Sequence, residues 1–166
     1  MSEPMEHLTQ DDEVARAAVP AESLAVDLLP LIKKAELRHP DLGLPRERFA
    51  AFLRGCLIAE AVPPAMFDAL HVEDLYLACA YGLGIEEAQA RVESEHFARV
   101  LRRLERMRTP PAISADILQE LRCRLVEMVC PEGEGQAYNG RGSLGGWLFI
   151  AAIRSAERRV SRAQKE

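Results

Sequence analysis

The sequence predicts an all-α protein, a helical bundle, on three observations. Apolar residues recur at spacings of three and four in several long segments, as they do on the buried face of a helix. Aromatic residues make up 5% of the chain while the hydrophobic fraction is 48%, so aliphatic side chains that favour helices must fill the core. The strict alternation of polar and apolar residues that marks a half-buried strand never lasts more than a few residues.

The 166-residue chain divides into three predicted parts. Residues 1–20 are polar and acidic and have no sustained periodicity, which predicts a mobile tail. Residues 21–70 are predicted to form an N-terminal helical module. Residues 71–166 are predicted to form a second helical domain.

The N-terminal module contains two predicted helices and a short further segment. The first helix covers residues 21–38, with Leu and Ile every three or four positions. Pro30 lies inside it, so a kink or a break is expected there. The second helix covers residues 45–60 and has Pro45 at a first-turn position. A short segment at residues 65–70 follows a pair of prolines.

The second domain opens with two predicted helices. The first begins near His71 and is interrupted at Gly82, the first of two glycines. The second covers residues 85–107 and is stopped by the pair of prolines that starts at Pro110.

Two more helices complete the second domain. The third covers residues 114–129, with Ser114 as the expected N-cap and Asp116 in the first turn, where an acid favours the helix dipole. A glycine-rich loop follows over residues 130–146. The fourth helix covers residues 143–162 and overlaps the end of that loop.

Charge is distributed unevenly along the chain, whose formal net charge is −5. This total argues against a protein that coats nucleic acid over its whole surface. Residues 1–30 hold seven acidic residues against one base, whereas residues 141–166 hold six basic residues against two acids. The asymmetry favours an acidic tail and a basic contact surface, and two merely solvated ends are the alternative.

The last predicted helix joins an apolar stripe to a row of arginines. Trp147 lies within the stripe, so we expect it to anchor the helix in the core. Arg154, Arg158 and Arg162 are four residues apart and share a face, with Arg159 beside them. Because the guanidinium fork suits phosphate, such a helix can dock on a nucleic-acid backbone. A non-binding amphipathic helix is the alternative.

Gly140, Gly142 and Gly145 form a GxGxxG pattern before this helix. A dinucleotide site also requires a strand before the loop, and the polar residues 131–136 cannot form a buried one. We therefore favour a flexible turn with Ser143 as the N-cap of the helix. The free N–H groups of the helix start could still hold a phosphate.

We expect neither an enzyme nor a cofactor or metal site. The four cysteines form no CxxC pair, and the four histidines show no Ser-His-Asp or Cys-His signature. No apolar run approaches the length of about 18 residues that a membrane helix needs. The acidic N-terminus lacks the features of a signal peptide, so we expect a cytoplasmic protein with reduced thiols.

The run DILQE at residues 116–120, followed by a loop and by YNGRGSLGGWL at residues 138–148, resembles region two of the extracytoplasmic-function sigma factors. In that family an acid-x-x-Gln-Glu helix precedes a loop. A Gly/Ser-x-x-x-Trp-Leu segment then leads into a helix that ends in arginines. The resemblance covers about residues 71–162 and is strongest over residues 143–159.

The resemblance implies a role at bacterial RNA polymerase. In the family, the acid-Gln-Glu helix docks on the clamp coiled coil of the largest subunit, which would assign polymerase binding to Asp116, Gln119 and Glu120. The loop and the Trp-bearing helix recognise and melt the minus-ten element on the non-template strand. The residues that match this DNA-binding segment are Asn139, Arg141, Ser143, Arg154, Arg158, Arg159 and Arg162.

The chain ends at Glu166, about where the linker to region four is expected. We therefore expect region two without the helix-turn-helix that reads the minus-thirty-five element. The expected function is that of a sigma-factor-like transcription regulator that contacts core RNA polymerase, or another regulatory protein, and single-stranded promoter DNA. The alternative is a helical protein–protein adaptor or a degenerate sigma relative without DNA binding.

Overall fold

The computed structural model describes residues 27–130 and 137–166. Within these residues the protein is all helical, as the sequence predicts, and the described part contains no strand. The predicted acidic tail, residues 1–20, lies outside the described residues. The elements in chain order are α1 (Leu29–Arg38), α2 (Arg46–Ala59), the 3₁₀ turn η4 (Pro64–Ala69), α3 (Val72–Gly82), α4 (Glu86–Val92), the π turn η5 (Glu93–Phe97), α5 (Ala98–Arg106), α6 (Pro111–Glu127) and α7 (Leu144–Ala163).

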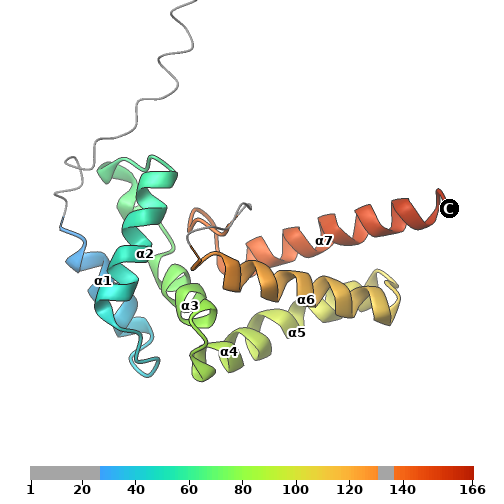
Figure 1. Cartoon of the computed structure of the whole chain (residues 1–166), viewed down its shortest axis with the longest axis horizontal. Coiled ribbons are helices and arrows are strands. Elements are labelled where there is room, and N and C mark those ends of the chain that lie inside the picture. The colour runs from blue at the N-terminus through green and yellow to red at the C-terminus, as the bar shows by residue number, and fades with distance from the viewer. Residues whose placement is uncertain (1–26, 131–136) are drawn as a thin grey trace, which may run out of the picture.

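Helix α3 stands at the centre of the molecule (Figure 1). On one side it packs against α1 and α2, and on the other it packs against α4, α6 and α7. Helices α5, α6 and α7 pack on one another as a three-helix layer that extends away from α1 and α2. One hydrophobic cluster runs through all of these elements. No helix within residues 27–130 and 137–166 has the length and apolar character needed to cross a membrane.

The central position of α3 follows from its sequence, VEDLYLACAYG. Eight of its residues are buried, and only the acids of the first turn and the terminal glycine are not. Gly82 lets α3 approach α6 closely. A Cβ atom at this position would lie 2.7 Å from the carbonyl oxygen of Leu125 and 2.9 Å from the side chain of Val129.

Helix α1 begins later than predicted within the described residues. Its first residue is Leu29, whose N–H donates to Oδ1 of Asp27 at 3.0 Å. Pro30 is the second residue of the helix, so it marks the start and neither kinks nor breaks the helix interior. The physical reason is that a first-turn N–H has no intrahelical partner, so proline costs no bond there.

The start of helix α6 also differs from the predicted one. It begins at Pro111, the proline expected only to stop the preceding helix. Ser114 is therefore not the N-cap: its N–H donates to the carbonyl oxygen of Pro110 at 2.9 Å, and its side chain is buried. Asp116 likewise lies beyond the first turn. Proline, with its fixed φ, is suited to the first helical position and determines the start.

Helix α7 begins as predicted. Ser143 is its N-cap, and the Ser143 Oγ accepts a hydrogen bond from the N–H of Gly146 at 3.0 Å. The apolar stripe of the helix is buried at Leu144, Leu148 and Ala151. The sequence prediction for this helix is therefore confirmed in its start, its cap and its buried face.

Candidate functional site

Helices α6 and α7 lie side by side and carry most of the residues that the sequence singled out. On α6, Asp116 and Gln119 are exposed, whereas Glu120 is half-buried and faces α7. On α7, Arg154 and Arg162 are exposed, and Arg159 is half-buried. The two predicted surfaces are therefore neighbours that meet along the line where the helices pack.

Glu120 is the centre of a polar cluster at this line. Its Oε2 accepts a hydrogen bond from the Oγ of Ser155 at 2.9 Å and another from Nη2 of Arg159 at 3.2 Å. Its Oε1 accepts from Arg124, one turn further along α6, and lies 3.7 Å from Nη2 of Arg158. The carboxylate thus fixes the rotation of α7 relative to α6.

The electrostatics of the cluster keep Glu120 ionised. Burial alone would raise the pKa of its carboxyl group, but the hydrogen bonds from Ser155 and Arg159 and the charge of Arg124 outweigh burial and lower the pKa. Arg159 also lies near a second acid, with 3.7 Å between its Nη1 and Oδ2 of Asp116. The predicted polymerase-binding and DNA-binding residues are therefore joined by ion pairs in the free chain.

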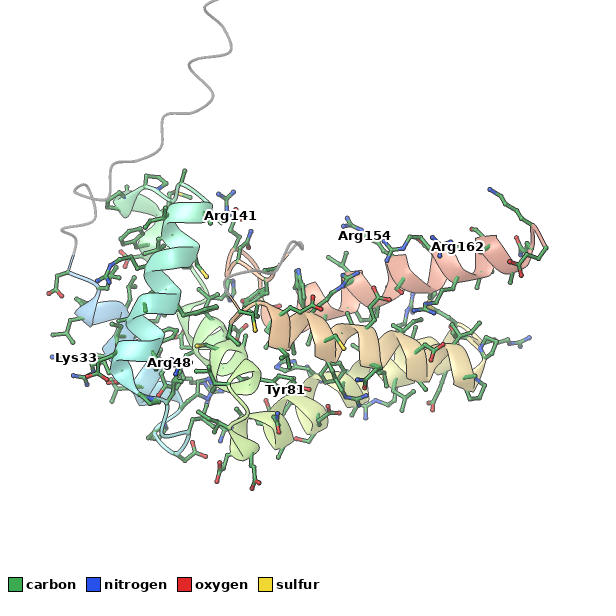
Figure 2. All side chains as sticks on the ribbon, viewed as in Figure 1. Lys33, Arg48, Tyr81, Arg141, Arg154 and Arg162 are labelled. Atoms are coloured by element: carbon green, nitrogen blue, oxygen red, sulfur yellow. The ribbon has the colours of Figure 1, made fainter. Side chains whose placement is uncertain are left out.

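The arginines of α7 divide into two kinds. Arg158 and Arg159 reach back to acids of α6. Arg154 and Arg162 point away from α6 on the outer side of α7 (Figure 2), and within residues 27–130 and 137–166 neither has an ion-pair partner. Arg154 and Arg162 are thus the α7 arginines most accessible to phosphate.

The loop before α7 is folded onto the rest of the protein over residues 137–143. Tyr138 is buried and its hydroxyl donates to the carbonyl oxygen of Gly142 at 2.6 Å. The side-chain oxygen of Asn139 accepts from the N–H of Arg141 at 3.1 Å, which closes a local turn. The guanidinium of Arg141 donates to the carbonyl oxygen of Glu60 at the end of α2, at 3.3 Å. This part is therefore an ordered turn and not the flexible one that we expected.

Gly140 shows why glycine is required in this turn. Its φ is +77°, in the region that side-chain-bearing residues rarely adopt. A Cβ atom there would also lie 2.6 Å from a methyl carbon of Leu75 on α3. The carbonyl oxygen of Gly140 accepts the N–H of His71 at 2.8 Å. Gly140 thus serves the packing of the loop against α3, whereas a Cβ atom at Gly142 would meet nothing within 4 Å.

Trp147, the predicted core anchor, is partly buried. It packs against the hydrophobic core, and its ring centroid lies 5.9 Å from that of Tyr138. Neighbouring Leu148 and Leu144 are fully buried and lie on the same face of α7 as Trp147. Trp147 therefore covers the edge of the core, between α7 and the loop.

The described surface includes two hollows of different size. The larger, of about 750 Å³, lies between α5 and the start of α7 and includes Arg99, Arg102 and Arg106. These arginines were not among the predicted site residues, because only the apolar positions of that helix entered the prediction. Their spacing of three and four residues was the signal that could have found them.

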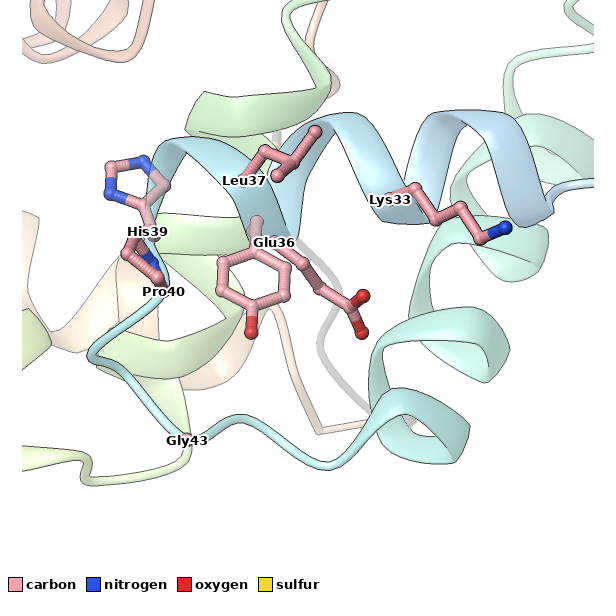
Figure 3. Close-up of a pocket in the computed structure, with 7 residues that line it drawn as sticks. Lys33, Glu36, Leu37, His39, Pro40 and Gly43 are labelled. Atoms are coloured by element: carbon pink, nitrogen blue, oxygen red, sulfur yellow. The ribbon is translucent and has the colours of Figure 1, made fainter.

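The smaller hollow, of about 460 Å³, lies between α1 and α3 (Figure 3). His39 lines it, is 5% exposed, and accepts a hydrogen bond at Nδ1 from Nη1 of Arg91 at 2.8 Å. Glu36, another lining residue, is paired with Arg46 at 2.7 Å. Burial lowers the pKa of His39, and the charge of Arg91 adds to the effect. Glu36 and Nδ1 of His39 are thus committed to the fold, whereas the buried Nε2 of His39 has no hydrogen-bond partner within the described residues.

Comparison of the chain with models of known protein families, with curated proteins and with solved structures found no match. A function for the chain is therefore inferred from the arrangement of α6, α7 and residues 137–143 before α7.

Proposed function

We propose that this chain is a sigma-region-two-like transcription regulator that works in the cytoplasm on bacterial RNA polymerase. One observation carries the proposal: exposed Asp116 and Gln119 on α6 lie on the helix next to exposed Arg154 and Arg162 on α7. A protein that holds polymerase and DNA together needs two such surfaces close to each other. The order of the motifs along the chain matches the order in the sigma family.

The polymerase contact is proposed on the exposed face of α6. Asp116 and Gln119 provide an acid and an amide one turn apart, which suit a helical partner that offers basic and polar side chains. Glu120 borders this face, but Ser155, Arg124 and Arg159 already engage its carboxylate. Its main contribution is to hold α7 beside the docking face.

The DNA contact is proposed on α7 and the loop before it. Arg154 and Arg162 are exposed and available to phosphates, which a guanidinium binds through charge-assisted hydrogen bonds. Asn139, Arg141 and Ser143 lie in the adjoining turn. Their hydrogen bonds hold this turn beside the start of α7, where an opened strand would pass.

Binding of a labelled single-stranded minus-ten oligonucleotide, measured by fluorescence anisotropy over a range of salt concentrations, tests the DNA contact. For Arg154→Ala/Arg162→Ala we expect weaker binding and a salt slope that is shallower by about 0.7 for each lost phosphate contact. Arg38→Ala/Arg54→Ala, which removes two exposed arginines from α1 and α2, is the matched control. Equal slopes for the two double variants would contradict the assignment of the DNA contact to α7.

A second candidate, a protein–protein adaptor, is favoured by apolar side chains exposed on the N-terminal elements. Leu37 on α1 is 82% exposed and Met66 in η4 is 53% exposed, with Ile58 on α2 at 43%. Such residues are common at docking surfaces when they gather into a patch. If core polymerase fails to bind while Leu37→Ser abolishes capture of another helical protein, the adaptor is the better account.

A further inference from the structure

The groove between α5 and the start of α7 has a basic wall. Arg99, Arg102 and Arg106 line it from α5, and all three are exposed. They span seven residue steps, or about 10 Å along the helix axis. A row of charges of this length suits a chain of anionic groups better than a single small anion.

These arginines are not committed elsewhere in the described part of the chain. Arg99, Arg102 and Arg106 form no ion pair within residues 27–130 and 137–166, in contrast to Arg122, whose Nε lies 2.7 Å from Oε1 of Glu93. The one acid that lines the groove, Asp74, accepts the N–H of Leu144 at 2.8 Å. Asp74 therefore supports the start of α7, and within residues 27–130 and 137–166 it forms no ion pair with the three arginines.

The opposite wall of the groove is apolar, and part of it is backbone without side chains. Phe149 is half-buried and Ile150 is 50% exposed, while Gly145 and Gly146 offer backbone without side chains. The guanidinium carbon of Arg103 lies over the Phe149 ring, 5.8 Å from its centroid, so this arginine covers one face of the ring and leaves the other for a base. An aromatic face beside a basic row is the combination that binds single strands through stacked bases and paired phosphates.

His96 closes one end of the groove beside Gly145. A Cβ atom at Gly145 would lie 3.0 Å from Nδ1 of His96, so the glycine makes room for the imidazole. Burial lowers the pKa of His96, which keeps the ring neutral at neutral pH. The positive charge that faces the groove therefore comes from the arginines alone.

We propose that this groove binds single-stranded nucleic acid, with phosphates on Arg99, Arg102 and Arg106 and a base against Phe149. The proposal rests on the proposed function and deepens it, because it gives the strand a path along α5 in addition to the arginines of α7. A nucleic-acid duplex fits this site less well, because the three arginines line a concave groove between two helices and a duplex is wider than a single strand. An acidic peptide would match the charge but would leave the aromatic wall without a role.

The test compares three arginine variants of the full chain in binding to a labelled oligothymidylate across a salt series. The groove variant is Arg99→Ala/Arg102→Ala/Arg106→Ala, and the matched control is Arg38→Ala/Arg48→Ala/Arg54→Ala, which removes three exposed arginines from α1 and α2. The third is the α7 double variant. Since all substituted side chains are exposed, circular dichroism is expected to show the same melting curve for every variant.

We expect the groove variant to bind several-fold more weakly at low salt, with a slope that is shallower by about 2, as three lost phosphate contacts predict. Phe149→Leu is expected to weaken binding without changing the slope, because stacking releases no counterion. The proposal is overturned if the groove variant matches the control, or if a polyglutamate peptide binds the groove as tightly as the oligonucleotide. If the full chain does not associate with polymerase but its groove still binds the oligonucleotide, the proposed function alone is contradicted. If only the α7 variant loses oligonucleotide binding, the groove proposal alone is contradicted.

Discussion

At the scale of single residues, the carboxylate of Glu120 joins α6 to α7 through partners that lie 35 and 39 positions later in the chain, Ser155 and Arg159. A sequence pattern does not reveal pairs at this separation, because helical periodicity relates only near neighbours. What the pattern did predict was a local feature, Ser143 as a cap, whereas Trp147, predicted to anchor α7 in the core, is partly buried and packs against the core.

Glu120→Gln tests the value of this cluster. The glutamine amide keeps the shape of the Glu120 side chain but removes its charge. Half-buried Arg159 then lacks its closest acid, and an N–H₂ group stands where the hydrogen-bond donors around it need an acceptor. We expect a loss of about 1–2 kcal/mol in the free energy of unfolding at pH 7, measured by urea denaturation. Glu127→Gln is the control, since Glu127 is exposed on the same helix. An equal effect of both variants would contradict the structural role of Glu120.

Buried His39 and half-buried His96 predict how the stability of the fold depends on pH. Burial lowers the pKa of both His39 and His96, so each ring stays neutral in the folded chain while the unfolded chain takes up a proton near pH 6.5. Stability is then greatest above about pH 6.5 and falls as the pH decreases below it, by at most about 1.4 kcal/mol per pH unit for each histidine.

His39→Gln should flatten this dependence, as measured by urea denaturation between pH 7.5 and 5.5. His71→Gln, which changes an exposed imidazole, should leave the profile close to that of the wild type. If the profile of His39→Gln keeps the full slope, His39 is not a source of the pH dependence.

At the scale of elements, the close contact of α3 and α6 depends on Gly82. Gly82→Ala places a Cβ atom 2.7 Å from a backbone oxygen of α6, which cannot move without shifting the helix. We expect a loss of about 1–3 kcal/mol in the free energy of unfolding. Gly55→Ala in α2, where nothing lies within 4 Å of the new Cβ atom, should instead stabilise the chain by about 0.5–1 kcal/mol. Thermal melts of both variants check the predicted opposite signs.

The predicted helix over residues 85–107 shows where sequence patterns fail at this scale. It is continuous from Glu86 to Arg106, but one π turn interrupts the α-helical bonding at Glu93–Phe97. Arg122 of α6 binds both ends of that turn, with Nε 2.7 Å from Oε1 of Glu93 and the guanidinium carbon 5.2 Å from the Phe97 ring centroid. The π turn thus depends on a contact with Arg122 of another helix. The spacing of apolar residues along the chain does not reveal such a contact.

At the scale of the whole molecule, the fold class could be predicted because apolar periodicity is local and strong. The central position of α3 could not, since periodicity does not say which buried faces meet. Tyr76 of α3 packs edge-on against Phe49 of α2, with ring centroids 4.9 Å apart, and stacks near His39 after α1. The core is therefore continuous across the predicted boundary at residue 71.

A shortened chain that begins at His71 tests how independent the two predicted parts are. It would expose the face of α3 that α1 and α2 cover, including Tyr76, which is 3% exposed in the full chain. We expect a lower melting temperature and a less cooperative transition by circular dichroism. A melting curve equal to that of the full chain would show that residues 71–166 fold without the first module.

The central claim is that the exposed face of α6 docks on RNA polymerase. Co-sedimentation of the full chain with purified bacterial core polymerase at low salt tests it most directly. We predict that the wild type sediments with polymerase, that Asp116→Ala/Gln119→Ala weakens this association at least tenfold, and that the exposed control Glu86→Ala/Glu87→Ala does not. The claim is contradicted if the wild type stays in the supernatant, or if the α6 variant sediments as well as the control.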